Sequence, residues 1–141
     1  MQKNYSKKVF YYILFILFLN TAKAHCQIKS SLTEKLTANK ELFNVNIDQA
    51  FKETDNLLKE AAKKNDVLAK MQLYERRCKY FYSKLNVNQL VTQAEQLSKI
   101  AKENKDVYYQ SMANIYLAEV YSINGLPDKA MIYLNENLDL T

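Results

Sequence analysis

From Ser31 to the end of the chain, apolar residues recur three and four positions apart, which is the spacing of amphipathic helices. This pattern predicts six helices, at about 32–43, 47–64, 67–85, 89–103 and 107–124, and from 127 onward. The residue before each of the first five can cap it, because a side-chain oxygen there accepts a hydrogen bond from a free backbone N–H group. These predicted caps are Ser31, Asn46, Asp66, Asn88 and Asp106.

The only glycine and the only proline of the chain lie two positions apart, at Gly125 and Pro127. Glycine readily adopts the left-handed backbone conformation that closes a helix, and proline begins a helix well because its φ angle is preset. So little glycine and proline leaves almost no material for tight turns and hairpins. The chain is therefore predicted to be all-α, with one helix-to-helix turn at this place.

Three predicted connections share a pattern: a large apolar residue, a small polar residue, a β-branched residue and an asparagine. The pattern occurs at 43–46, 85–88 and 121–124, and it predicts the same connection three times. The last two copies and their flanks align at a separation of 36 residues, which pairs Ala94 with Ala130. A helix pair in every repeat predicts an α-solenoid of about three antiparallel pairs, in units of about 31–65, 66–105 and 106–141.

The last unit resembles a tetratricopeptide repeat (TPR). That family has a leucine–glycine pair, a tyrosine three residues on, a glycine in the turn and an alanine in the second helix. The matching residues here are Leu117-Ala118, Tyr121, Gly125, Ala130, Leu134 and Leu138. Fewer positions match in the middle unit, at Phe81-Tyr82, Leu85, Ala94 and Ala101, and in the first, at Leu36, Phe43 and Ala61. The resemblance covers roughly residues 31–141 and implies a right-handed solenoid.

The resemblance also implies a binding surface, because the first helices of TPR pairs line a concave wall that binds extended or helical peptides. It places the groove on the third and fifth predicted helices, at Arg76, Lys79, Ser83 and Asn86, and at Met112, Ile115, Glu119 and Ser122. These positions lie opposite the packing stripes, so an ordinary solvated helix face is the alternative interpretation. The apolar Met112 and Ile115 favour a partner, since exposed apolar groups often mark an interface.

Residues 1–26 have the features of a secretory signal peptide. A basic stretch is followed by eleven apolar residues at 9–19 and then by small residues, with possible cleavage after Ala24 or Cys26. As a helix, the apolar stretch is roughly 16 Å long, about half the thickness of a bilayer core. We therefore expect a mature domain of residues 27–141 that is exported to the periplasmic or extracellular side of a bacterial envelope.

Charge and composition exclude several functions. The formal net charge is +5, but residues 1–24 hold four of the 20 basic residues and no acidic one, so 16 basic and 15 acidic residues remain. Without a basic face, this remainder is not expected to bind nucleic acid. One histidine and two cysteines cannot form a zinc site, and Cys78 lies on an apolar helix face where burial is expected. Without a recognisable catalytic group, we expect no enzyme activity and no cofactor.

Two functions remain open from the sequence. The first is a non-enzymatic, exported scaffold that binds a protein or peptide partner on its concave face. The second is the extracytoplasmic sensory domain of a larger membrane-bound signalling protein or transcriptional regulator. No segment after Leu138 covers the sixth helix, so we expect the chain to be the front of a longer array. Membrane contact is expected only through the signal peptide or a downstream segment.

Overall fold

The structure is a computed structural model that describes residues 31–140. Within this range all regular structure is helical, and the predicted all-α class is confirmed. The helices are α2 (Leu32–Val45), α3 (Ile47–Lys63), α4 (Val67–Ser83), α5 (Val87–Asn104), α6 (Val107–Ile123) and α7 (Pro127–Leu138). None of these helices is long and apolar enough to cross a membrane. The predicted signal peptide, residues 1–26, lies outside the described residues.

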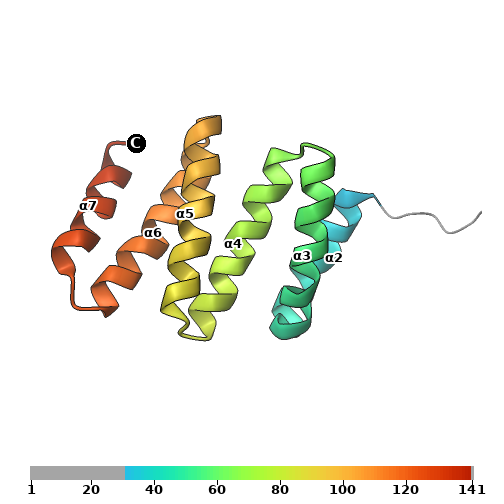
Figure 1. Cartoon of the computed structure of the whole chain (residues 1–141), viewed down its shortest axis with the longest axis horizontal. Coiled ribbons are helices and arrows are strands. Elements are labelled where there is room, and N and C mark those ends of the chain that lie inside the picture. The colour runs from blue at the N-terminus through green and yellow to red at the C-terminus, as the bar shows by residue number, and fades with distance from the viewer. Residues whose placement is uncertain (1–30, 141) are drawn as a thin grey trace, which may run out of the picture. The chain divides into compact units, whose positions relative to one another are not determined.

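The helices follow one another in chain order, and each packs against the next (Figure 1). In addition, α4 contacts α6. Three clusters of buried residues form the core, and each cluster joins three consecutive helices. The first joins α2, α3 and α4, and the other two join α4, α5 and α6. By contrast, α7 contributes only Ala130 as a buried residue.

From α3 onward the helices recur with a period of 40 residues, whereas the starts of α2 and α4, Leu32 and Val67, are 35 positions apart. The second helices of the pairs begin at Ile47, Val87 and Pro127, and the first helices α4 and α6 begin at Val67 and Val107. The predicted separation of 36 residues is therefore wrong. A separation of 36 aligns residues 85–88 with residues 121–124, which are similar in sequence but occupy different places in their turns. The connections differ in geometry even where their sequences look alike.

Most predicted helix starts are confirmed by hydrogen bonds of the capping side chains. Asn46, Asp66 and Asp106 each accept a bond from the backbone N–H three residues on, at 3.1, 2.9 and 3.1 Å. The prediction for Asn88 is wrong, because Asn86 caps α5 at 3.2 Å. The cause is Leu85, whose φ of 53° is left-handed and ends the turn two residues earlier than expected.

The three similar connections are therefore not equivalent, contrary to the prediction. Asn46 alone separates α2 from α3, without a left-handed residue. Between α4 and α5 the left-handed position is Leu85, and between α6 and α7 it is Gly125, with a φ of 68°. Pro127 is the first residue of α7, as predicted. Of these three similar connections, only the last two contain a left-handed residue between their helices.

Candidate functional site

Two adjacent hollows lie on the face formed by the first helices, α2, α4 and α6. The larger has a volume of about 350 Å³ and is lined by Lys40, Phe43, Asn44, Ile47, Gln72, Glu75, Arg76, Lys79, Tyr108 and Tyr109. The smaller has a volume of about 280 Å³ and is lined by Thr33, Leu36, Thr37, Lys40, Asp66, Leu68, Ala69, Gln72 and Arg76. Because both are lined by Lys40, Gln72 and Arg76, they form one groove, which we call the α2–α4–α6 groove.

Arg76 lies where the two hollows meet, and its side chain is buried, with the residue only 9 % exposed. Its Nη1 donates hydrogen bonds to the backbone oxygen of Leu36 and to Oδ1 of Asn39, both at 3.0 Å. These bonds connect α4 to α2. Burial lowers the pKa of Arg76 below its ordinary value, because removal from water disfavours the charged form. The ordinary pKa of arginine is so high that the group stays charged.

Asn39 completes a buried polar network beneath Arg76. Its residue exposure is 0 %, and its Nδ2 donates to the backbone oxygen of Ala50 at 2.9 Å and to Oε2 of Glu53 at 3.1 Å. Since its Oδ1 accepts from Arg76, the one side chain bonds to α3 and α4 from α2. Buried polar groups are almost always hydrogen-bonded, and this network satisfies all the polar atoms of Asn39. The network fixes the floor of the groove.

The remaining lining combines cations with aromatic rings. Lys40 and Lys79 are exposed at the rim, and Lys79 pairs with Glu75 at 3.1 Å. Tyr108 is 60 % exposed, and its ring meets that of Tyr109 edge to face, with centroids 4.9 Å apart. With Arg76, the described residues that line the larger hollow include three cations and one carboxylate beside aromatic and aliphatic side chains. Such a mixed lining suits an extended segment with both apolar and acidic side chains.

The structure brings two of the eight predicted site residues into this groove, Arg76 and Lys79. The others line neither hollow. Ser83 donates from Oγ to the backbone oxygen of Tyr80 at 2.8 Å, and Asn86 caps α5. The expectation that Arg76 lies opposite the packing surface is wrong, because that side chain is buried against α2.

The four residues predicted on α6 form one row along that helix. Met112, Ile115, Glu119 and Ser122 follow Tyr108 at spacings of four, seven, eleven and fourteen positions, which is one face of a helix. Met112 is half-buried and packs against the core, whereas Ile115 and Ser122 are exposed. The row extends from the groove residue Tyr108 but lies beyond the two hollows.

The sequence analysis missed the α2 side of the groove and its aromatic residues. Lys40, Phe43 and Tyr108 were not predicted, although all three lie on first helices of pairs. A signal existed for Lys40 and Phe43, because the first helix of the first pair should contribute to a concave wall as the third and fifth do. The first unit matches the repeat pattern poorly, so the resemblance does not extend to its first helix.

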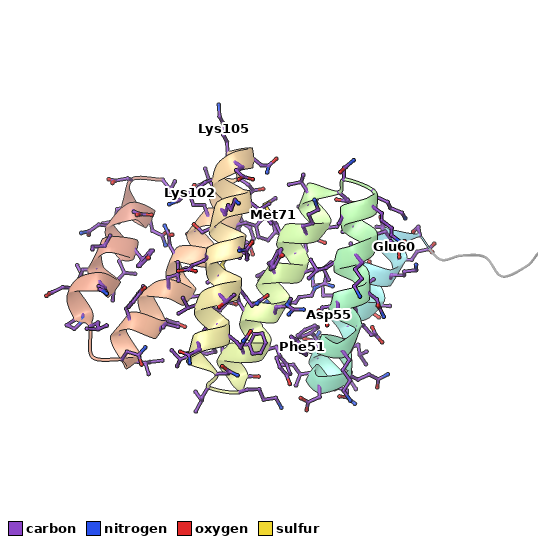
Figure 2. The ribbon with its side chains drawn as sticks, viewed as in Figure 1. Phe51, Asp55, Glu60, Met71, Lys102 and Lys105 are labelled. Atoms are coloured by element: carbon purple, nitrogen blue, oxygen red, sulfur yellow. The ribbon has the colours of Figure 1, made fainter. Side chains whose placement is uncertain are left out.

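The neighbouring residue Arg77 points into a different environment, toward α3 and α5. Its Nε donates to Oε1 of Gln93 at 2.7 Å, and its Nη1 forms an ion pair with Asp55. The guanidinium also lies over the ring of Phe51, 5.0 Å from the centroid. Figure 2 shows Phe51 and Asp55 on the side of α3 that faces α4. Arg77 therefore ties three helices together, and it has a carboxylate partner, whereas Arg76 has none among residues 31–140.

Known proteins offer no guide to the groove. Comparison with protein-family models, with curated proteins and with solved structures finds no match for this chain. Among residues 31–140, no group of histidine, cysteine, aspartate and glutamate side chains could hold a metal ion. The geometry of the α2–α4–α6 groove therefore carries the functional argument.

Proposed function

We propose that the chain is an exported, non-enzymatic scaffold that binds an extended segment of a protein or peptide in the α2–α4–α6 groove. The observation that carries this proposal is the continuity of the two hollows across three first helices. Peptides in this mode are bound by pockets for side chains along a groove. The exposed ring of Tyr108 and the lysines at the rim supply apolar and polar contacts to such a segment.

The same proposal places the chain among right-handed, TPR-like solenoids. From α3 onward, corresponding helices recur every 40 residues, and the helices pack against their neighbours along the chain, as repeat arrays do. The period is longer than the roughly 34 residues of a TPR. Helices α3 to α6 are 17 or 18 residues long, which accounts for a unit of this size.

One observation favours the second candidate, a sensory domain within a larger protein. The exposed stripe of α7 consists of Met131, Leu134 and Leu138. One period earlier, these correspond to Val91, Ala94 and Ser98, which are half-buried or buried. Terminal repeats usually present a polar outer face, so a further helix over α7 would suit the stripe. Sequencing the 3′ end of the gene tests this candidate, which predicts further helical units followed by a membrane span of about 20 residues.

Selection from a displayed library of random octapeptides tests the groove. The chain, expressed with its leader, is the bait, and the selected peptides are then measured on two tyrosine variants. We expect Tyr108→Ala to weaken binding at least tenfold, because it removes the exposed ring of the groove. Tyr82→Ala is the matched control: this tyrosine is also exposed, but it lines neither hollow. Equal binding to both variants, or a selection without binders, would refute the groove.

A further inference from the structure

We propose that Arg76 is the anion-binding residue of the α2–α4–α6 groove. On this view the groove selects a segment with an aspartate or glutamate side chain within its length. The inference rests on the proposed function and names the chemistry that the groove recognises. The juxtaposition that carries it is a buried guanidinium at the meeting point of two hollows, with no carboxylate partner among residues 31–140.

The first step concerns the charge of Arg76. Within the described part of the chain no carboxylate lies within ion-pair distance of this guanidinium, although the residue is only 9 % exposed. Arg77, which is less deeply buried, pairs with Asp55. Buried charges in proteins are normally paired, because removing an ion from water costs several kcal/mol. A carboxylate from a partner would supply the missing counter-charge.

The second step concerns the hydrogen-bond donors of Arg76. Both of its bonds to the protein come from Nη1, which faces Leu36 and Asn39 on α2. Its Nε and Nη2 donate to no other residue in the range 31–140. Neither nitrogen is among the fully buried polar atoms that lack a hydrogen-bond partner. A guanidinium binds a carboxylate best through two parallel N–H groups, and Nε and Nη2 form such a pair.

A purely structural role explains only part of this arrangement. The bonds from Nη1 hold α2 to α4, but they leave Nε and Nη2 without a protein partner among residues 31–140. Lys40 and Lys79 line the larger hollow with Arg76, and the one carboxylate there, Glu75, is paired with Lys79. Glu75 also acts on Arg76 through its charge, but with Arg76 included the described residues that line the larger hollow carry three positive charges against one negative charge. This net positive lining favours an anion.

The third step concerns the position of the carboxylate within the bound segment. Arg76 lines both hollows, so the groove continues on either side of it. A segment that fills the groove passes over the guanidinium and extends beyond it in both directions. The structure therefore favours an acidic side chain within the segment over a carboxylate at a chain end.

A pair of capped peptides tests this inference directly. An octapeptide with a central glutamate is taken from the selection described above, acetylated and amidated, and compared with its glutamine counterpart. Binding to the chain is followed by nuclear magnetic resonance, in which the Nε–H group of Arg76 gives its own signal. We expect the glutamate peptide to bind roughly tenfold to a hundredfold more tightly, the range for a hydrogen bond to a charged group. Only that peptide should shift the Arg76 signal.

Variants separate the role of Arg76 in binding from its role in the fold. Arg76→Met should abolish the preference for glutamate, and Lys79→Gln, which leaves the bonds to α2 intact, should reduce it several-fold. Lys99→Gln is the matched control, because this exposed lysine lies outside both hollows. If Arg76→Met does not fold, the affinities of the two peptides for the unmodified chain and the shift of the Arg76 signal still test the inference.

The outcomes distinguish this inference from the proposed function. Equal affinity for the two peptides overturns the role of Arg76 while leaving a peptide-binding groove. The same holds if the glutamate peptide binds more tightly without moving the Arg76 signal. A selection that returns no peptide sensitive to Tyr108→Ala overturns the proposed function and this inference together.

Discussion

Replacing Asn39 with alanine tests the polar network beneath the groove. This side chain is fully buried, and it is the only contact described above that reaches α3 and α4 from α2 at once. Asn39→Ala removes the bonds to Ala50, Glu53 and Arg76. The guanidinium of Arg76 then keeps a single bond to the protein, through the backbone of Leu36.

The expected loss follows from these three hydrogen bonds. A typical intramolecular hydrogen bond contributes about 0.5–1.5 kcal/mol, and bonds to charged groups contribute about twice that. Two of the three bonds of Asn39 involve a charged partner, Glu53 or Arg76. With each bond taken near the lower end of these ranges, we expect Asn39→Ala to lower the free energy of unfolding by about 3 kcal/mol. That is a large fraction of the roughly 5–15 kcal/mol that holds a domain together.

Urea unfolding followed by far-ultraviolet circular dichroism measures this loss. With a slope of about 1.5 kcal/mol per molar urea, the midpoint should fall by about 2 M. Hydrogen exchange should show the largest loss of protection in α2 and α3. Asn56→Ala is the control: this asparagine is exposed on α3, so its effect should stay within about 0.5 kcal/mol. An Asn39→Ala variant as stable as the control would refute the network.

Three further predictions concern the turns and the buried thiol. Leu85 and Gly125 both have a left-handed backbone. Leu85→Gly should therefore raise the free energy of unfolding by about 0.5–1 kcal/mol, and Gly125→Ala should lower it by about 1–2 kcal/mol. Urea unfolding measures both changes, and two changes of the same sign would contradict this prediction. Asn86→Ala should cost about 1 kcal/mol and Asn88→Ala almost nothing, because only Asn86 caps α5; thermal melts of the two variants distinguish them. Burial raises the pKa of the Cys78 thiol to about 12, so at pH 8 a thiol reagent should label it only after unfolding. The folded thiol stays protonated where the unfolded one ionises, so stability should fall as pH rises from about 9 toward 12. Rapid labelling of Cys78 itself in the native chain, located by peptide mapping, would contradict the burial.

Local signals in the sequence predict the helices and most of their starts. Asn46, Asp66 and Asp106 could be identified because a capping bond joins residues only three positions apart. Asn88 was wrongly chosen because the correct cap depends on Leu85, which adopts a left-handed conformation that leucine rarely takes. The left-handed residues Leu85 and Gly125 are 40 positions apart, whereas the similar sequences at 85–88 and 121–124 are 36 apart, so the sequence pattern gives a period four residues too short.

The groove could be predicted only where its residues follow helical spacing. Lys79 was predicted from the resemblance to TPR pairs, through its place on the first helix of the second pair, and it lies at the rim of the larger hollow. The burial of Arg76 depends on Leu36 and Asn39, which precede it by 40 and 37 residues, and no pattern within α4 reveals them. Tyr108 was missed because the helical spacing of an aromatic residue in the first turn is the same whether its ring packs in the core or lies at the rim of a groove.

The packing of each helix only against close neighbours in the chain also bears on how this protein reaches its native state. In the described part, even the bonds of Arg76 to α2 span no more than one repeat. Loops closed during folding are therefore short, and proteins rich in such local contacts fold quickly. A polypeptide that emerges N-terminus first, from a ribosome or through a narrow pore, can complete its earliest hairpin before the last one is available. The helix pairs would then assemble one after another from the N-terminus, and little apolar surface would stay exposed until a distant segment is synthesised.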